Sequence, residues 1–281
     1  MGSFRTSSVF RFTRDYELLR KILRDGIIPN FCEEDLSFGE QQFYVGIPMA
    51  SFCDIPIMLL DEHTSRYGNY GLALSKEWAI KQGITPVMYV ANDIVLQSVF
   101  YHHHQNQRTL EWFQKEGGQP TLTQENHVLR LLSPKEYDDF LNTMEEHSID
   151  THIIGYLKKY IGEYKSKPIN NYEENEWRFL VPDEKETKWF WTQDEYRSWR
   201  FPNEDYSADK PFPSAALKSH TLRFSYNDVR YILLKDDEFK ARMIDFIKKT
   251  KTIGGTEITS EENREDLICK LMTLDQVKRD F

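Results

Sequence analysis

Residues 63–71 combine a histidine with two Tyr-Gly steps in the run HTSRYGNYG. Glycine allows a ligand to approach the backbone closely, and tyrosine offers a flat ring and a hydroxyl group. His63, Tyr67 and Tyr70 therefore form a candidate wall of a ligand site. A tight turn with packed aromatic side chains is the alternative interpretation of the same residues.

A second candidate lies in the run EENEWR at residues 173–178. In a strand that begins at Glu176, the side chains of Glu176 and Arg178 share one face and Trp177 takes the other. A carboxylate and a guanidinium aimed into one cleft can bind and polarise a ligand. The alternative is a solvated ion pair between neighbouring strands.

Three polar residues near the end of the first expected strand, Arg11, Thr13 and Arg14, form a third candidate. Strand ends are common ligand sites in α/β proteins, and arginine suits anionic groups. Solvated arginines on the surface are the alternative.

Residues suited to metal or nucleophile chemistry give weaker signals. Adjacent residues of a helix or strand point in different directions, so the histidine triplet at 102–104 cannot face one ion. We expect an exposed polar segment there, a core cysteine at Cys53 and a surface histidine at His63. No metal site is expected.

Alternating strands and helices must position these candidates. Apolar periodicity predicts strands at residues 9–13, 49–53, 70–74 and 86–91, with a loop at 29–46 and a turn or short helix near 61–68. One helix is predicted to begin after Asp15 and to end near Gly26, and Ser75 is predicted to cap another.

The second half of the chain predicts helices at residues 133–144 and 149–164, followed by a strand at 176–181. One or two strands are expected at 220–234, and an amphipathic helix at 236–249 carries acidic residues at its start and lysines at its end. Residues 183–213 are predicted to form an ordered insertion, in which exposed Trp189 and Trp191 offer an interface.

This order of elements predicts one mixed α/β domain of the α+β class over residues 1–250. Residues 9–91 would form the N-terminal half of the core, 92–172 a mainly helical insertion and 173–250 the C-terminal strands and helix. Residues 251–281 would form a C-terminal tail.

Composition limits the function classes. The 281 residues are 40% hydrophobic, which suffices for a packed core. No run approaches the roughly 18 apolar residues of a membrane span. Three widely spaced cysteines suit a reducing cytoplasm, and the net charge of −9 argues against a broad nucleic-acid surface.

Four segments resemble AbiGi, a bacterial family of phage-resistance proteins: VFRFTRDYELLRKILRDGIIPNFCEEDLSF, IPMASFCDIP, HTSRYGNYGLALSKEWAIKQGITPVMYV and NEWRFLVP. The resemblance is dense over residues 9–91 and returns at 175–182. It implies a role in antiviral defence by abortive infection. Proteins of this family have been labelled the antitoxin of a toxin–antitoxin pair, which implies a partner protein encoded nearby.

The order of parts is similar, more distantly, to ADP-ribosyltransferase-like folds, although a strict His/Tyr/Glu or Arg/Ser/Glu signature is not visible. This likeness implies a split β-sheet core with a helical insertion in the middle and a C-terminal amphipathic helix, and NAD as a substrate. By the same likeness, Glu176, His63 and Tyr67 would be catalytic. The residues that would bind NAD are Arg11, Thr13, Arg14, Tyr70 and Arg178.

Two hypotheses follow. In the first, the protein transfers ADP-ribose to a protein or nucleic-acid acceptor, or cleaves NAD. In the second, it is a non-catalytic antitoxin or regulatory partner that restrains a toxin. Convergence of Arg14, Tyr67 and Glu176 on one concave pocket would favour the first hypothesis.

Overall fold

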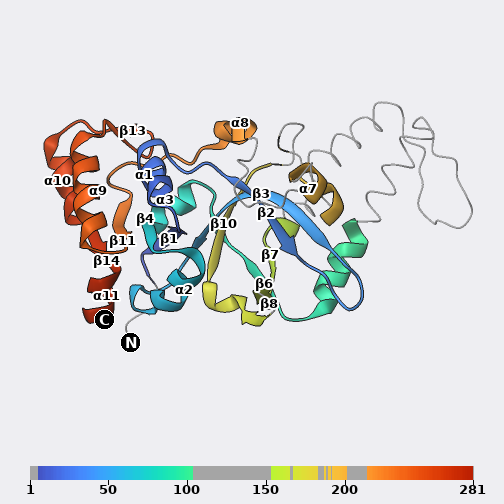
Figure 1. The fold of residues 1–281 in the computed structure, drawn as a ribbon. Coiled ribbons are helices and arrows are strands. Elements are labelled where there is room, and N and C mark those ends of the chain that lie inside the picture. Colours follow the sequence, from blue (N-terminus) through green and yellow to red (C-terminus); the bar gives the residue numbers. More distant parts are fainter. Residues whose placement is uncertain are drawn as a thin grey trace, which may run out of the picture.

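The computed structural model describes residues 6–103, 153–164, 167–182, 187, 189, 190, 192–200 and 214–280. Its centre is a mixed sheet with the strand order β14-β11-β4-β1-β3-β10-β5, and β2 pairs with β3 beside this path (Figure 1). The strands are β1 Ser8–Thr13, β2 Asn30–Asp35, β3 Tyr44–Cys53, β4 Tyr70–Ser75, β5 Thr85–Pro86, β10 Glu176–Leu180, β11 Val229–Leu234 and β14 Leu271–Thr273. The prediction of a mixed α+β fold is confirmed.

Three two-stranded sheets accompany the main sheet. They are formed by β6 (Met88–Val90) with β7 (Leu157–Lys159), β8 (Ile161–Tyr164) with β9 (Lys167–Asn170), and β12 (Thr252–Ile253) with β13 (Thr256–Glu257). The helices of the described chain include α1 Tyr16–Asp25, α2 Leu60–Tyr67, α3 Lys76–Lys81, α7 Gln193–Arg200, α8 Ser214–Leu217, α9 Asp237–Lys249, α10 Glu261–Cys269 and α11 Leu274–Asp280. Short 3-10 helices are η1 Ile57–Leu59, η2 Asn171–Glu174 and η3 Lys218–His220.

Local sequence signals explain several of these helices. The Asp15 side chain accepts a hydrogen bond from the Glu17 amide at the start of α1, and Gly26 ends that helix with a φ of 97°. Ser75 caps α3 by accepting from the Trp78 amide. The predicted caps at Asp15, Gly26 and Ser75 and the predicted amphipathic helix α9 are thus confirmed.

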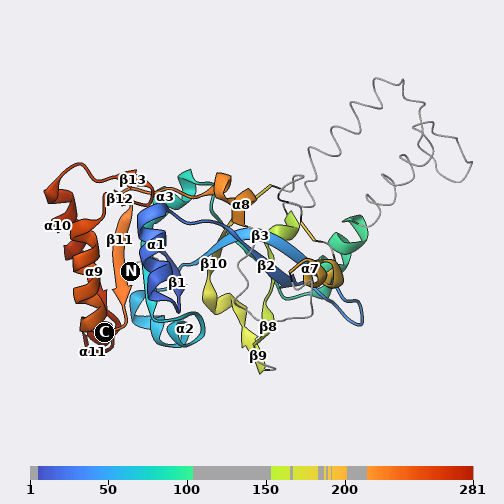
Figure 2. The same ribbon diagram turned by 45° about the horizontal axis from the view of Figure 1, so that its top comes forward.

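Alternation along the strands divides the core between the two faces of the sheet. Leu72 and Leu74 of β4 pack with residues of α1 and α9, whereas Ala73 packs with Leu60 of α2 on the other face. Figure 2 shows α1, α2 and α9 grouped around β1 and β11 at one end of the molecule. A third cluster surrounds the far end of β3 and contains Trp189.

The sheet is split between β1 and β3. Strand β1 pairs with β4 at six positions but with β3 only at Phe10↔Cys53. Beyond that position, β3 continues with β10 and β2 while β1 remains with β4. Among the described residues, no further pair of β1 and β3 residues joins the two strands beyond that position.

The structure corrects several predictions. Strand β2 and the start of β3 lie within the expected loop at 29–46. Residues 157–164 of the expected helix at 149–164 form β7 and β8, because pairing with β6 and β9 overrides the helical periodicity. The strand expected at 86–91 is divided between β5 and β6. The helix expected at 133–144 lies outside the described residues.

The residues after Lys251 do not form a separate tail. Leu267 and Leu271 are buried against the main core, and β14 adds a parallel strand beside β11. Burial of this apolar surface accounts for the order of the segment. Trp189 also differs from its prediction, because it is only 1% exposed and its indole nitrogen donates to the Val181 carbonyl at 2.9 Å. Trp191 lies outside the described residues.

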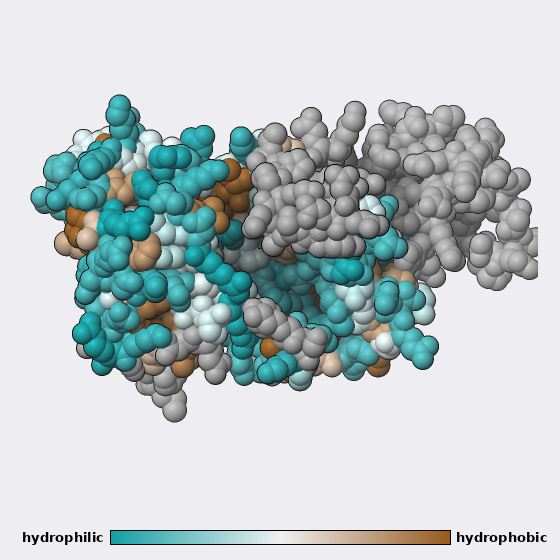
Figure 3. Space-filling model, in the orientation of Figure 1, coloured by the Kyte–Doolittle hydropathy of each residue, from teal (hydrophilic) through white to brown (hydrophobic). Residues whose placement is uncertain are grey.

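The surface in Figure 3 is mainly hydrophilic over the described residues, with hydrophobic side chains in small separate groups. None of the described helices has the length and apolar character needed to span a bilayer.

Candidate functional site

A cavity of about 320 Å³ lies at the seam between β1 and β3. This volume is at the lower end of the range of roughly 300–1,000 Å³ for small-molecule sites. Its lining combines residues far apart in the sequence, including Arg11, Cys32, Glu34, Ser51, Cys53, His63, Tyr67, Lys158, Glu174 and Glu176. Three of the predicted catalytic residues and one predicted ligand-binding residue thus share one cavity.

Helix α2 supplies the aromatic wall. His63 and Tyr67 lie four positions apart on one face of the helix, and their ring centroids are 4.4 Å apart. The His63 ring also meets Phe12 of β1 edge-on at 5.0 Å. Gly68 ends the helix with a φ of 115°, and an added Cβ there would lie 2.3 Å from the Thr13 carbonyl oxygen. Glycine therefore lets α2 approach the end of β1 and brings its rings to the seam.

Strand β10 supplies the buried acidic group. Glu176 and Arg178 share one face as predicted, but the solvated alternative is wrong, because they are 6% and 0% exposed. The Arg178 guanidinium donates to both oxygens of Glu176, at 2.7 and 3.1 Å, and forms an ion pair with Glu34 of β2 at 2.8 Å. Arg178 does not line the cavity. It therefore holds the Glu176 carboxylate from outside the cavity lining.

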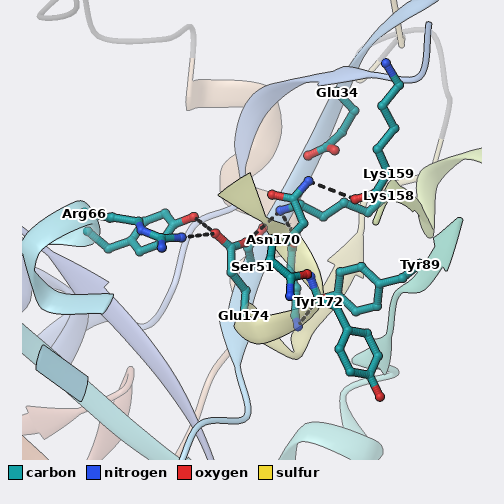
Figure 4. Close-up of polar contacts among 12 residues, drawn as sticks. Glu34, Ser51, Arg66, Tyr89, Lys158, Lys159, Asn170, Tyr172 and Glu174 are labelled. Carbon is teal, nitrogen blue, oxygen red and sulfur yellow. Dashed lines mark hydrogen bonds and ion pairs between the residues drawn. The ribbon is translucent and has the colours of Figure 1, made fainter. Parts of the chain in front are cut away.

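Lys158 and Glu174 complete the site and were not predicted. The Lys158 ammonium lies 2.9 Å from Glu174 and 2.6 Å from Glu176, and its side chain is 16% exposed. The Tyr67 hydroxyl donates a hydrogen bond to the other oxygen of Glu174. Figure 4 shows Glu174 between Arg66 on one side and Lys158 on the other. The Arg66 guanidinium is 3.8 Å from Glu174.

The turn before β10 aims both glutamates at the cavity. Asn175 adopts the left-handed conformation, with φ 42° and ψ 54°, between Glu174 and Glu176. Asparagine tolerates this region better than most residues. The Asn175 carbonyl accepts from the Asp54 amide at 3.0 Å, and the Glu176 amide donates to the Tyr89 hydroxyl at 2.7 Å. These bonds anchor the turn at both ends.

Electrostatics keep Glu176 ionised. Burial alone would raise its pKa, but Arg178 and Lys158 outweigh burial and lower the pKa to about 2. Burial would lower the pKa of Lys158, yet Glu176, Glu34 and Glu174 together raise it above its ordinary value. The cavity therefore contains a network of ionised groups at neutral pH.

His63 and Tyr67 are neutral at the same pH. Burial lowers the pKa of His63 to about 4, despite the opposing effect of Glu174. Burial, followed by the charge of Glu174, raises the pKa of Tyr67 far above its usual value. The aromatic wall is thus uncharged and faces an ionised carboxylate.

Arg11 is the cation whose charge the network does not balance. It is partly buried and donates to the Ser51 carbonyl of β3 at 3.0 Å, which places it across the seam. Within the described part of the chain, no carboxylate forms an ion pair with it. Burial lowers its pKa from the ordinary value of arginine, as expected of an incompletely compensated cation.

Three other predicted residues lie away from the cavity. The Thr13 hydroxyl accepts from the Asp15 amide at 3.1 Å and stabilises the turn before α1. Arg14 donates to the Arg66 carbonyl and holds α2. Tyr70 is buried on the opposite face of the sheet, where its ring packs on Tyr16. Of the three residues expected to converge, Tyr67 and Glu176 therefore line the cavity and Arg14 does not.

Cysteine and histidine placement also differs from expectation. Cys53 is buried as predicted, but His63 lines the same cavity instead of the surface. Burial raises the pKa of the Cys53 thiol, which disfavours the nucleophilic thiolate. His103 is buried whereas His102 is exposed. The described residues contain no cluster of three metal-ligating side chains.

The missed residues differ in how visible they are in the sequence. Glu174 stands two positions before Glu176 in a run already of interest, and two glutamates flanking an asparagine could have indicated a paired site. Lys158 carries no comparable signal, because only the parallel pairing of β7 with β6 brings it there.

Comparison with known proteins gives two matches. The model of the family described as "Putative abortive phage resistance protein AbiGi, antitoxin" matches residues 26–235. The Abortive phage resistance protein AbiGi of Lactococcus lactis subsp. cremoris is 26% identical over 256 residues, covering 84% of this chain and 89% of that protein. No solved structure matches the chain.

Proposed function

Because the chain belongs to the AbiGi family of abortive phage resistance proteins, we propose that it acts in phage defence through an ADP-ribosyltransferase-like cleft that binds NAD. The cleft either transfers ADP-ribose to an acceptor or hydrolyses NAD. The observation that carries this proposal is the convergence of Arg11, the two rings of α2 and Glu176 on one cavity.

Each group has a chemical role toward NAD. Arg11 suits an anionic phosphate oxygen, because it offers several donors and lacks a described carboxylate partner. The neutral rings of His63 and Tyr67 offer a flat surface to the cationic nicotinamide without repelling it. Glu176 supplies a negative charge within the same cavity.

The reaction breaks the bond between the nicotinamide nitrogen and the ribose, and the bonding electron pair leaves with nicotinamide. The ribose then carries an oxocarbenium-like positive charge, which an adjacent carboxylate stabilises. Water or an acceptor group forms the new bond at the anomeric carbon and loses a proton. We assign this stabilisation to Glu176 and proton acceptance to Glu174, whose carboxylate lies on the other side of the Lys158 ammonium.

Lys158 must move for this chemistry. Its ammonium is 2.6 Å from Glu176 and occupies the side of the carboxylate that lines the cavity. Arg178 can remain in place, because it contacts Glu176 from outside the cavity lining. Entry of the cationic nicotinamide would replace one positive charge beside Glu176 with another.

The test uses purified protein, labelled NAD, and candidate protein and nucleic-acid acceptors. We expect released nicotinamide or labelled acceptor with the natural sequence, and at least a hundredfold slower reaction for Glu176→Gln, in line with the loss of one preorganised electrostatic contact. Glu163→Gln serves as a control, since Glu163 is an exposed glutamate of β8. Thermal melts report whether each variant is folded. Equal rates for the natural protein and Glu176→Gln would refute the proposal.

A second candidate function is that of an antitoxin or regulatory partner, which the description of the matching family favours. Met58 and Leu59 are 57% and 62% exposed and line a groove of about 550 Å³ beside the cavity. If a toxin encoded nearby covers this groove, Met58→Ser with Leu59→Ser should weaken its co-purification. Unchanged co-purification would exclude this surface.

A further inference from the structure

A second cavity, of about 580 Å³, lies between α1 and α9 and shares no lining residue with the candidate site. Buried residues of the two helices pack in the same hydrophobic cluster. Tyr16 of α1 meets Phe239 of α9 edge-on, with ring centroids 4.9 Å apart. Thr252 of β12 closes the groove, and its hydroxyl donates to the Arg24 carbonyl at 2.9 Å. We call this space the α1–α9 groove.

Cationic side chains dominate the α1–α9 groove although the chain as a whole has a net charge of −9. The charged residues that line it are Arg20, Arg24, Arg242, Lys249, Lys251 and Asp245. Two carboxylates outside the lining partly compensate them. Glu17 lies 2.6 Å from Arg20 and 3.8 Å from Arg242, and Asp25 lies 2.8 Å from Arg24.

Five cations thus face three carboxylates, which leaves two positive charges in the groove. Among the described residues, no carboxylate forms an ion pair with Lys249 or Lys251. Lys249 is the last residue of α9, and Lys251 lies in the short connection between α9 and β12. Cations at this end also suit the helix dipole, but that effect leaves their side chains available to a ligand.

Two buried donors in the groove have no hydrogen-bond partner among the described residues. The Tyr16 hydroxyl and the Arg20 Nε are shielded from solvent and make no hydrogen bond, and Tyr16 is 6% exposed. A buried unsatisfied polar atom destabilises the folded state, so each such atom calls for an explanation. The Nε–H group can only donate, and a hydroxyl can donate, so an acceptor in the groove can satisfy each of them.

We propose that the α1–α9 groove binds the phosphate group of a nucleotide-sized small molecule. Unpaired donors require an acceptor, and the excess positive charge requires that the acceptor be anionic. The Arg20 side chain is 38% exposed and lines the groove together with Tyr16, so a ligand in the groove can contact both residues. Lys249 and Lys251 then neutralise the ligand from the rim.

The dimensions favour a small molecule over a nucleic-acid strand. The cavity volume lies within the range of roughly 300–1,000 Å³ for small-molecule pockets. A strand would need phosphate contacts along an extended basic surface, whereas the cations named above line a single groove of a protein with a net charge of −9.

Calorimetric titration at low ionic strength tests this proposal with three probes: inorganic pyrophosphate, ATP and a short single-stranded RNA. We expect pyrophosphate or ATP to bind the full-length protein. Lys249→Gln with Lys251→Gln should weaken binding at least about tenfold, as the loss of charged hydrogen bonds predicts. Lys248→Gln is the matched control, because Lys248 is exposed on the same helix turn and does not line the groove.

Tyr16→Phe separates ligand binding from folding. Removal of an unsatisfied hydroxyl should leave the melting temperature unchanged or higher, while it weakens pyrophosphate or ATP binding severalfold. Absence of binding by both small probes, binding of RNA alone, or equal affinity for the double lysine variant and Lys248→Gln would each overturn the proposal. Because the readout is binding to a separate groove, Glu176→Gln should leave it unchanged whatever happens to NAD.

Discussion

Substitution of Lys158 by methionine tests whether the ionic network in the cleft is as tightly coupled as its geometry indicates. Methionine keeps most of the length of the side chain and removes its charge. The change removes the ammonium that lies 2.9 Å from Glu174 and 2.6 Å from Glu176. Arg178 continues to neutralise Glu176, but among the described residues Glu174 retains only the Tyr67 hydroxyl and the more distant Arg66.

The expected loss of unfolding free energy at pH 7 is about 3 kcal/mol. Removal of one partner from a buried ion pair typically costs roughly 3–5 kcal/mol. The lower end applies because Lys158 is 16% exposed and because Arg178 remains beside Glu176. Lys159→Met is the matched control on the same strand. Lys159 pairs with Asp35 at 3.5 Å, and the two side chains are 25% and 49% exposed, so its loss should cost less than about 1 kcal/mol.

The loss of unfolding free energy caused by Lys158→Met should become smaller as the pH falls. In the natural protein the folded pKa of Glu176, about 2, lies below its ordinary value of 4.5. Its stabilisation is therefore complete above about pH 4.5 and disappears as the pH falls toward 2. In Lys158→Met, two neighbouring carboxylates repel each other, and one of them takes up a proton at a higher pH. The two proteins should consequently converge in stability below pH 4.5.

Urea unfolding of both variants and the natural protein at pH 7 and pH 4 measures these differences. A cost below about 1 kcal/mol for Lys158→Met at pH 7, or an equal cost at both pH values, would refute the coupled network. A similar cost for Lys159→Met would show that loss of any charge from β7 has the same effect.

Three further outcomes follow from the structure. Arg11→Met should leave the melting temperature within a few degrees of the natural value, because Arg11 has no described ion pair. The same variant should weaken NAD binding at least about tenfold in calorimetry. A large loss of stability with intact NAD binding would contradict this prediction. The natural protein should lose up to about 3 kcal/mol between pH 6.5 and 4, where the unfolded state binds a proton that His63 in the folded state does not. Urea unfolding of His63→Phe should lack this component, and an unaltered pH profile would exclude it. Trp189→Ala should destabilise the protein by about 3–5 kcal/mol, since it removes a fully buried indole; unchanged stability with lost partner binding would restore the interface interpretation.

Elements with local signals could be predicted from the sequence, whereas those made by distant pairing could not. The start and end of α1 follow from Asp15 and Gly26, and the shared face of Glu176 and Arg178 follows from strand geometry. Strand β2 was missed because its sequence, NFCEED, is mostly polar. It forms because Phe31 is buried and because β3 pairs with it along its whole length.

The same distinction governs the site. His63 and Tyr67 were recognisable as neighbours, because four residues of helix bring their rings together. Tyr70 belonged to the same run but follows Gly68 into β4, where its side chain takes the opposite face of the sheet. Strand alternation after the turn decides this outcome, and the turn geometry was not evident from the sequence. Lys158 lies beyond any local inference, because it reaches Glu176 through β6 and β7.

The energetics of the cleft argue that its charges serve a function. Glu34, Glu174, Glu176, Lys158 and Arg178 lie in a partly or fully buried network, and buried ion pairs are often no more stabilising than apolar side chains of similar volume. The fold already has large hydrophobic clusters on both faces of the sheet, so the network is not needed to form a core. Arg11 adds a positive charge at the seam between β1 and β3, where Phe10↔Cys53 is the only pair among the described residues. Perturbed groups gathered in a cavity are typical of functional sites, and the proposed NAD site would place an anionic phosphate beside the unbalanced charge of Arg11.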